Sequence, residues 1–193
     1  MGTIEIIAQI MGIFGMILIS SSYQMKSQRK LIIFQLFGAG FFFVNFLLLG
    51  IAAGVLLTGA VMNLLGVARS FVFSNRKKFH AENPAWLVIF VSLYLAAYVL
   101  VFTVFGTKPT PKNFIVELLP VIGMTSTTFA FFSKKSDVSR KLGFINSPAW
   151  LIYDVINFSI GGIITEVLSL ASIVIGMIRH DRKKKNEAIT EED

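Results

Sequence analysis

The sequence has no cysteine and few charged side chains, and each absence narrows the class of protein. Without cysteine, disulfide bonds, thiolate metal sites and catalysis by a thiol are excluded. Only 15% of the 193 residues are charged, whereas about a quarter are charged in a typical soluble domain. The composition therefore argues against a soluble globular protein.

Motifs of phosphate-binding and metal-dependent enzymes are also missing. The sequence contains neither a glycine-rich phosphate loop ending in lysine nor an HExxH pattern. Its two histidines, His80 and His180, lie in basic segments, away from the acidic residues of the apolar runs. Because we also find no nucleophile–base pair, we expect no catalytic residues, no cofactor, no bound metal and no enzymatic activity.

The sequence is rich in long apolar runs. Of its residues, 54% are hydrophobic, and 19 are phenylalanine. A transmembrane helix needs about 20 mostly apolar residues, whereas a transmembrane β-barrel shows alternating segments of about 10. The first run has no basic stretch before it, so we expect a span and not a cleaved signal peptide. We predict an all-α integral membrane protein with seven transmembrane helices, at residues 3–24, 31–50, 52–73, 85–105, 114–132, 142–161 and 162–179.

The basic residues fall on alternate connections between these runs. Of the 18 Lys and Arg residues, all but Lys108 and Lys112 lie in or near the connections of one side. Cytoplasmic loops carry such an excess, so we expect a cytoplasmic C-terminus and an N-terminus on the outside. The net charge of +7 is then a signal of orientation, and we do not expect nucleic acid as a partner.

The runs also show a weak internal repeat. The sequence can be aligned with itself at the offset that pairs Asn45 with Asp154. The same offset pairs Asn63 with Ser172 and Lys26 with Lys135. The run 85–105 separates the three runs before it from the three runs after it. Because it crosses the membrane once, both groups of three have the same orientation. The result is two parallel three-helix repeats joined by a linker helix (3+1+3), a known transporter plan. The predicted divisions are 1–78 (first repeat), 79–113 (linker helix with its loops), 114–180 (second repeat) and 181–193 (charged cytoplasmic tail).

Two short links that contain glycine join neighbouring spans within the repeats. They are Gly50–Gly54, after the second run, and Gly161–Gly162, after the sixth. Gly50 and Gly54 have the small-xxx-small spacing of close helix contacts. We favour tight turns on the outer side at both links.

Polar side chains inside an apolar run are costly in hydrocarbon, so they indicate either helix packing or a cavity. In the run 142–161, two aromatic residues share one helical stripe with a carboxylate and an amide, and such a group can stack on a solute and bind it. An interfacial aromatic belt is the alternative. The candidate substrate-binding residues are Asn63, Ser172, Trp150, Tyr153, Asp154, Asn45 and Asn157.

Two further features suggest coupling and motion. Glu166 lies about one helical turn inside its run, where it acts in proton coupling together with Asp154 or stays ionised in an outer vestibule. Pro120 and Pro148 interrupt backbone hydrogen bonding inside their runs, as hinges or as static kinks.

Three segments of the sequence resemble a known family. SSSYQMKSQRKL at 20–31, NSPAWLIYD at 146–154 and a last run ending in IGMIR resemble the bacterial inner-membrane protein family YgjV. This resemblance implies an inner-membrane location and a distant relationship to the SWEET and PQ-loop transporters, which carry small solutes, sugars among them. Tyr23–Gln24 stands where those relatives have Pro-Gln, and Asn63 resembles the binding-site Asn of sugar carriers, while the second repeat has Ser172.

Two functions follow from these observations. The first is a secondary carrier or facilitator that moves an unidentified small polar solute across the bilayer by alternating access. The second is a non-transporting partner or sensor whose basic cytoplasmic face engages anionic lipids or another protein. A homo-oligomer is compatible with either function. A polar interior that is filled by its own hydrogen bonds and leaves no cavity would favour the second.

Overall fold

The structure, a computed structural model, describes residues 2–22, 28–54, 57–133 and 136–175. The expected tail at 181–193 and the pair Tyr23–Gln24 lie outside these residues. The described chain contains helices and turns and no strand, which confirms the all-α prediction. The helices are α1 (Thr3–Ser22), α2 (Gln28–Ala53), α3 (Thr58–Ser74), α4 (Arg76–Phe79), α5 (Ala85–Thr103), α6 (Pro111–Ser133), α7 (Ser136–Ile156) and Ile160–Ile175, here called the C-terminal helix.

Four of the described helices are long and apolar enough to cross a membrane: α1, α2 from Arg29 to Ala53, α5 and α6. The C-terminal helix is apolar but shorter, and α3 has 17 residues, which gives about 26 Å of rise against a hydrocarbon core of about 30 Å. α7 has the length but carries Asp137, Arg140, Lys141 and Asp154. Seven spans therefore remain a prediction.

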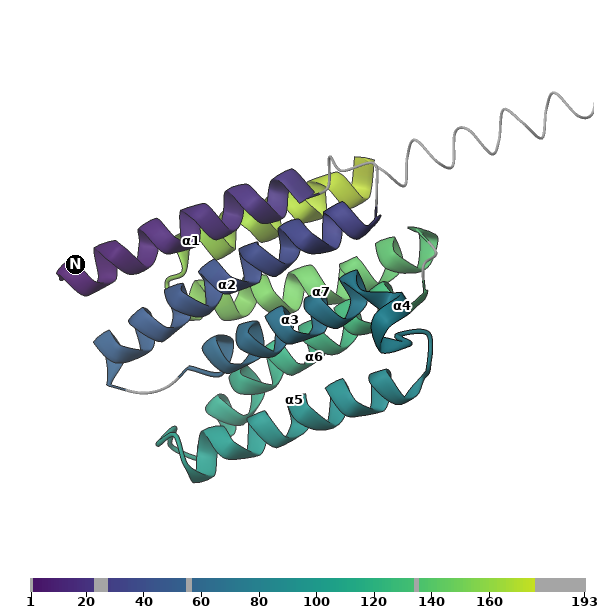
Figure 1. The fold of residues 1–193 in the computed structure, drawn as a ribbon. Coiled ribbons are helices and arrows are strands. Elements are labelled where there is room, and N and C mark those ends of the chain that lie inside the picture. Colours follow the sequence, from purple (N-terminus) through teal and green to yellow (C-terminus); the bar gives the residue numbers. More distant parts are fainter. Residues whose placement is uncertain (1, 23–27, 55–56, 134–135, 176–193) are drawn as a thin grey trace, which may run out of the picture.

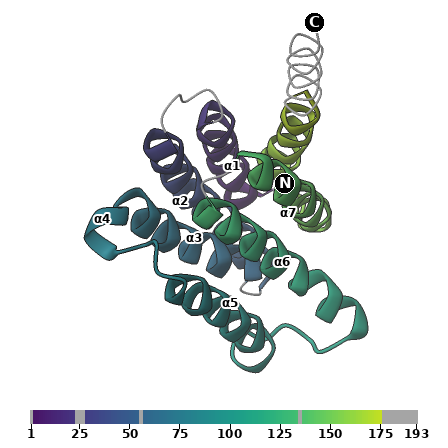
Figure 2. The same cartoon turned by 90° about the vertical axis from the view of Figure 1, so that its right-hand side faces the viewer.

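The long helices lie side by side in one bundle (Figure 1). α2 packs between α1 and α3, α6 packs on α7, and α3 also contacts α5 and α6. Figures 1 and 2 both place α5 at one edge of the bundle. This position agrees with a sequence that gives the run 85–105 few polar residues.

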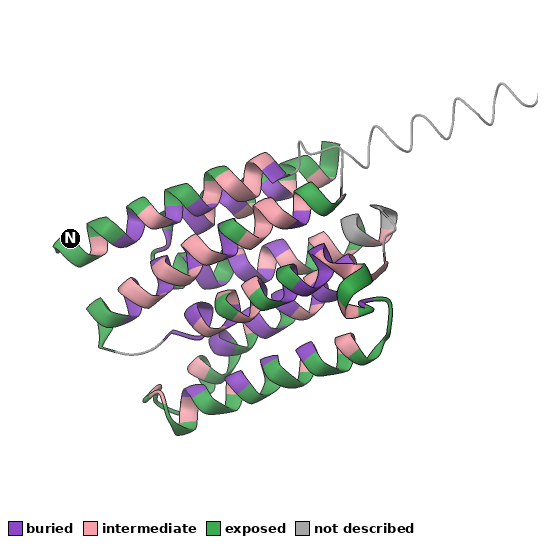
Figure 3. Cartoon of the chain, in the orientation of Figure 1, coloured by how far each residue is buried: buried purple, intermediate pink, exposed green. Residues whose placement is uncertain are grey.

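Apolar side chains occupy both the inside and the outside of this bundle. Phe46, Met62 and Phe73 are buried in the core, while Val88 and Ile115 are each 67% exposed. Figure 3 shows exposed residues along the outer faces of α1 and α5. Soluble monomers rarely expose apolar surface on this scale, so these faces are suited to contact with lipid.

The turns differ from the expected glycine links. Gly50 is buried inside α2, which runs on to Ala53, and the chain turns at Gly54, where φ is +72°. Gly161 and Gly162 lie in the first turn of the C-terminal helix, and the turn before it is formed by residues 157–159. The cause of the second difference is packing, because Gly161 lies against the backbone of Gly12 in α1.

Pro120 and Pro148 lie inside helices, as the sequence indicates. Pro120 is in α6 and Pro148 is in α7, and both helices continue past their proline. Pro120 is fully buried. Their role as hinges stays a prediction.

Candidate functional site

A cavity of about 110 Å³ lies between the helices that precede α5 and those that follow it. Its lining comes from α1, α2, α3, α6, α7 and the C-terminal helix, and none of the described lining residues belongs to α5. The lining residues are Ile19, Gln35, Ala39, Phe42, Phe46, Asn63, Gly66, Arg69, Met124, Thr127, Asn146, Trp150, Asp154, Gly162, Thr165 and Glu166.

α3 contributes Asn63, Gly66 and Arg69, which follow one another at a spacing of three residues and therefore share one helical face. Asn63 Nδ2 donates to the carbonyl oxygen of Gly59, one turn earlier, at 2.8 Å. Gly66 faces Met124 of α6 closely, since a Cβ at Gly66 would be 3.1 Å from Met124 Cε. Absence of a side chain at Gly66 therefore lets α3 and α6 approach beside the cavity.

Arg69 is the basic residue of the cavity, and its side chain is only 5% exposed. Nη1 donates to the carbonyl oxygen of Met124 at 3.2 Å, and the guanidinium carbon lies 4.8 Å from the centre of the Phe131 ring. Nε is buried and has no hydrogen-bond partner among the described residues. Sequence reasoning counted Arg69 only toward membrane orientation, although its spacing from Asn63 and Gly66 already placed it on their face.

α7 contributes Asn146, Trp150 and Asp154, one per turn at a spacing of four residues. Asn146 Oδ1 accepts a hydrogen bond from Thr127 Oγ1 of α6 at 2.9 Å. Asp154 is 2% exposed, and its Oδ1 has no hydrogen-bond partner in the described part of the chain. Its carboxyl group packs directly on Gly162, so a side chain at position 162 would collide with it.

Glu166, on the C-terminal helix, brings a second carboxyl group to the same cavity. Ser147 donates a hydrogen bond to this carboxyl group, whose Oε2 is buried without a partner among the described residues. The carboxyl groups of Glu166 and Asp154 are close enough to interact electrostatically. The cavity therefore combines two acidic side chains with one arginine.

Three of the seven predicted binding residues, Asn63, Trp150 and Asp154, line the cavity together with Glu166. Asn45, Tyr153, Asn157, Ser172 and both prolines are not among its described lining residues. Ser172 is exposed, and Asn157 donates to the carbonyl oxygen of Tyr153 at 2.9 Å, near the end of α7.

Tyr153 lies beside the cavity and joins three helices. Its ring is fully buried and 5.5 Å from that of Phe46. The backbone nitrogen of Gly59, in the first turn of α3, donates to its hydroxyl oxygen at 2.8 Å, and the hydroxyl is also hydrogen-bonded to Glu117 of α6. Tyr153 therefore ties α7 to α3 and α6.

Asn45 belongs to a group of hydrogen bonds that holds the turn before the C-terminal helix, here called the Gln9–Asn45 clamp. Gln9 donates to the carbonyl oxygen of Phe158 at 2.7 Å and accepts from the nitrogen of Ile160 at 3.0 Å. Asn45 donates to the carbonyl oxygen of Ala8 at 2.7 Å and accepts from Ser159 Oγ at 2.9 Å. In this arrangement Asn45 satisfies buried groups of the protein.

We expect Asn45→Ala to lower the stability of the folded protein, because the Ser159 hydroxyl and the Ala8 carbonyl would lose their buried partner. Such a loss costs about 1–3 kcal/mol. The measurement is the midpoint of thermal unfolding of the purified protein in detergent. Asn157→Ala is the matched control, since it removes a bond within one helix only, and an equal loss in both variants would contradict the clamp.

The described residues contain no group of three His, Asp or Glu side chains placed to hold a metal ion. The chemistry available in the cavity is that of charge pairing and hydrogen bonding, from Arg69, Asp154, Glu166 and the amides of Asn63 and Asn146. These groups are suited to holding a polar solute.

Comparison with known proteins identifies the family and nothing narrower. No curated protein and no solved structure matches the chain. A family model described as a bacterial inner membrane protein matches residues 6–184, which is most of the sequence. The chain is thus a member of the YgjV family of bacterial inner-membrane proteins.

Proposed function

We propose that this inner-membrane protein is a secondary carrier or facilitator of a small polar solute and not an enzyme. The observation that carries the proposal is the cavity itself, which is lined from both halves of the chain. It contains buried atoms of charged side chains that have no hydrogen-bond partner among the described residues. A protein that used its polar interior only for helix packing would have satisfied these atoms internally. A bound solute would supply the missing partners.

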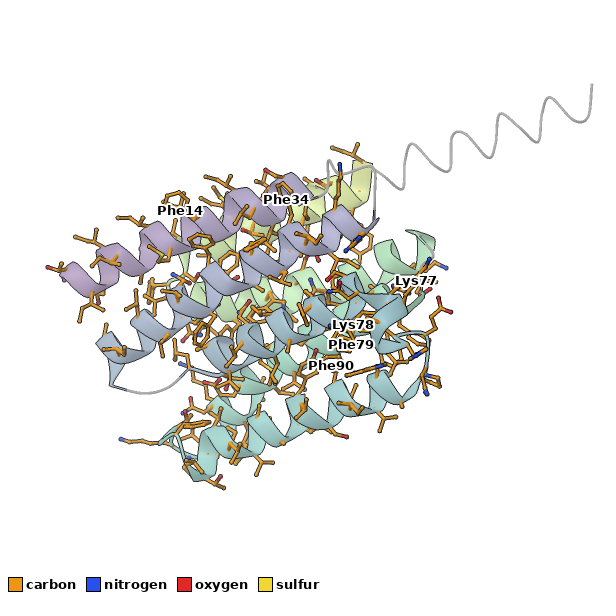
Figure 4. The ribbon with its side chains drawn as sticks, viewed as in Figure 1. Phe14, Phe34, Lys77, Lys78, Phe79 and Phe90 are labelled. Carbon is orange, nitrogen blue, oxygen red and sulfur yellow. The ribbon has the colours of Figure 1, made fainter. Side chains whose placement is uncertain are left out.

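We further propose that seven helices span the membrane as two triplets around this cavity, with α5 as the linker. The distribution of charge supports an N-terminus on the outside. Arg76, Lys77 and Lys78 of α4 lie at one end of the bundle, and Figure 4 marks Lys77 and Lys78 there. The connection between α5 and α6, which contains Lys108, lies at the opposite end, where α1 begins (Figure 1), and Lys112 follows in the first turn of α6. Cytoplasmic loops are the more basic ones, so the α4 end would face the cytoplasm.

Alternating access then requires the two triplets to rock against each other around the cavity. At the end where α1 begins, the Gln9–Asn45 clamp and the bond between Gly59 and Tyr153 hold the triplets together. Opening on that side would break these contacts, with Pro120 and Pro148 as the points of bending. The distant relationship to SWEET and PQ-loop transporters is part of this proposal.

The size of the cavity favours a solute smaller than a sugar. Its volume of about 110 Å³ is below the range of about 300–1,000 Å³ that is usual for pockets holding larger ligands. In this conformation the cavity is suited to a solute with only a few non-hydrogen atoms.

Alternating access can be tested without knowing the solute, because the chain has no cysteine of its own. Ala39 lines the cavity and is small, so Ala39→Cys should react with a small membrane-impermeant methanethiosulfonate both in right-side-out and in inside-out vesicles. Modification is read as a mass shift of the purified protein.

Ala97→Cys is the matched control, since Ala97 is also buried but lies on α5, away from the described cavity lining. It should react from neither side. Reaction of Ala39→Cys from one side only, or from neither, would contradict alternating access. That result would favour the second candidate, a partner or sensor, for which the internally bonded side chains of Gln9, Asn45 and Tyr153 are the supporting observation.

A further inference from the structure

The charged side chains of the cavity are separated by sign along the bundle. Arg69 lies five residues before the end of α3, on the side of α4. Asp154 lies two residues before the end of α7, and Glu166 six residues after the start of the C-terminal helix. α7 and the C-terminal helix meet at the end of the bundle opposite α4 (Figure 1). The cavity is therefore basic toward α4 and acidic toward the other end.

No ion pair joins Arg69 to Asp154 or Glu166 among the described residues. Arg69 Nη1 donates instead to the carbonyl oxygen of Met124. The opposite charges of the cavity thus do not neutralise each other directly.

Each end also contains a buried polar atom without a partner among the described residues. These atoms are Arg69 Nε at the basic end, and Asp154 Oδ1 and Glu166 Oε2 at the acidic end. Arg69 and Asp154 are each more than nine-tenths buried. Leaving a buried polar or charged group without a partner is destabilising, so a ligand with complementary groups at both ends would be favoured.

The chemistry of each end specifies a functional group. An ammonium group carries donors and no acceptor, which suits the two carboxyl groups of Asp154 and Glu166. A carboxylate suits the donors of a guanidinium. A cation alone would leave Arg69 unpaired, an anion alone would leave the acidic end unpaired, and a neutral solute would compensate neither charge.

We propose that the solute is a small zwitterion, with its ammonium group at Asp154 and Glu166 and its carboxylate at Arg69. This inference rests on the carrier function proposed above and names the class of its substrate. Between the two ends, the apolar side chains of Ala39, Phe42 and Trp150 line the cavity and would contact the methylene groups that join the two charges.

Four probes with the same number of non-hydrogen atoms test this charge pattern. They are β-alanine (zwitterion), β-alaninamide (cation), 3-hydroxypropionate (anion) and 3-hydroxypropionamide (neutral), with γ-aminobutyrate as a longer zwitterion. Binding to the purified full-length protein is measured by calorimetry and by the ligand-dependent shift in thermal unfolding. We expect at least one zwitterion to bind roughly tenfold or more tightly than the cation, the anion and the neutral probe.

Two variants assign the ends of the solute. Arg69→Gln should weaken the zwitterion roughly tenfold or more while leaving the cation unchanged, because only the carboxylate loses its partner. Asp154→Asn should weaken both the zwitterion and the cation and leave the anion unchanged. Arg69→Lys retains the charge and should recover part of the affinity. If Arg69→Gln does not fold, Asp154→Asn and the wild-type probe series still decide the question.

The outcomes separate this inference from the carrier function. Equal or tighter binding of the neutral, cationic or anionic probe overturns the zwitterion and leaves the carrier in place with another solute. Binding by none of the probes also overturns the zwitterion, while reactivity of Ala39→Cys from both sides would still support the carrier. If a zwitterion binds but Ala39→Cys reacts from one side only, the proposed binding site is supported and the proposed transport function is overturned.

Discussion

Gly161→Ala should prevent stable folding of the bundle or lower its free energy of unfolding by about 3 kcal/mol or more, at the upper end of what overpacking costs. A Cβ at this position would overlap the carbonyl carbon and oxygen of Gly12, well inside the 3.0 Å that Cβ atoms keep from other atoms. The clash is with backbone, so no change of rotamer can relieve it. The whole C-terminal helix would have to move away from α1.

Gly40→Ala is the matched control, because it adds the same methyl group in the interior of α2. The nearest atom to a Cβ at Gly40 is Val67 Cγ2, at 4.0 Å, which is ordinary contact. Alanine is also the better helix former by about 1 kcal/mol, so this variant should be as stable as the wild type or more so. The measurement is the yield of monodisperse protein in detergent with its midpoint of thermal unfolding. Similar values for the two variants would contradict the close packing of α1 on the C-terminal helix.

Asp154→Asn and Asn63→Ala should each abolish transport while leaving folded protein in the membrane. Both side chains line the cavity from different halves of the chain. For Asp154, removing one partner of a buried charge pair costs about 2–5 kcal/mol, which corresponds to a loss of affinity of about 30-fold to more than 1,000-fold. For the neutral Asn63, leaving a buried group without its hydrogen-bond partner costs about 1–3 kcal/mol. The measurement is uptake into proteoliposomes of whichever probe of the β-alanine series the wild-type protein takes up.

Glu5→Gln and Asn113→Ala are the controls for this experiment. Glu5 is a half-buried acidic residue in the first turn of α1, and Asn113 is near the start of α6, where it donates to the carbonyl oxygen of Lys108 at 2.9 Å. Neither is a described lining residue of the cavity, so both variants should transport at the wild-type rate. Normal transport by Asp154→Asn and Asn63→Ala would show that the solute binds elsewhere.

The sequence predicted the helices more reliably than their ends. Apolar runs of the right length gave the all-α fold, and the structure confirms it. The positions of the turns at the two glycine links were predicted less well. A sequence does not distinguish a glycine that relieves strain in a turn from one that permits close helix packing. Gly54 is of the first kind, with a φ of +72°. Gly161 is of the second kind, and only the position of Gly12 on another helix reveals it.

The site was predictable in part for a similar reason. The stripe that contains Trp150 and Asp154 follows from helical spacing, and the structure places both at the cavity. Asn45 and Tyr153 have the same polar character, but their partners are buried groups far away in the chain. Arg69 was missed because a basic residue near a helix end also fits membrane orientation. Whether a polar residue is structural or lines a cavity depends on its partners in the folded protein, and a single sequence does not show which residues those are.

The Gln9–Asn45 clamp has a consequence for biosynthesis. Gln9 belongs to α1, and the carbonyl that it binds, in Phe158, lies 149 residues later. During translation, Gln9 therefore has neither of its final partners until residues 158–160 are made, whereas Asn45 lacks only Ser159. The bundle closes only when the C-terminal helix arrives beside α1, so a chain that stops before the turn at 157–159 should be a substrate for membrane quality control.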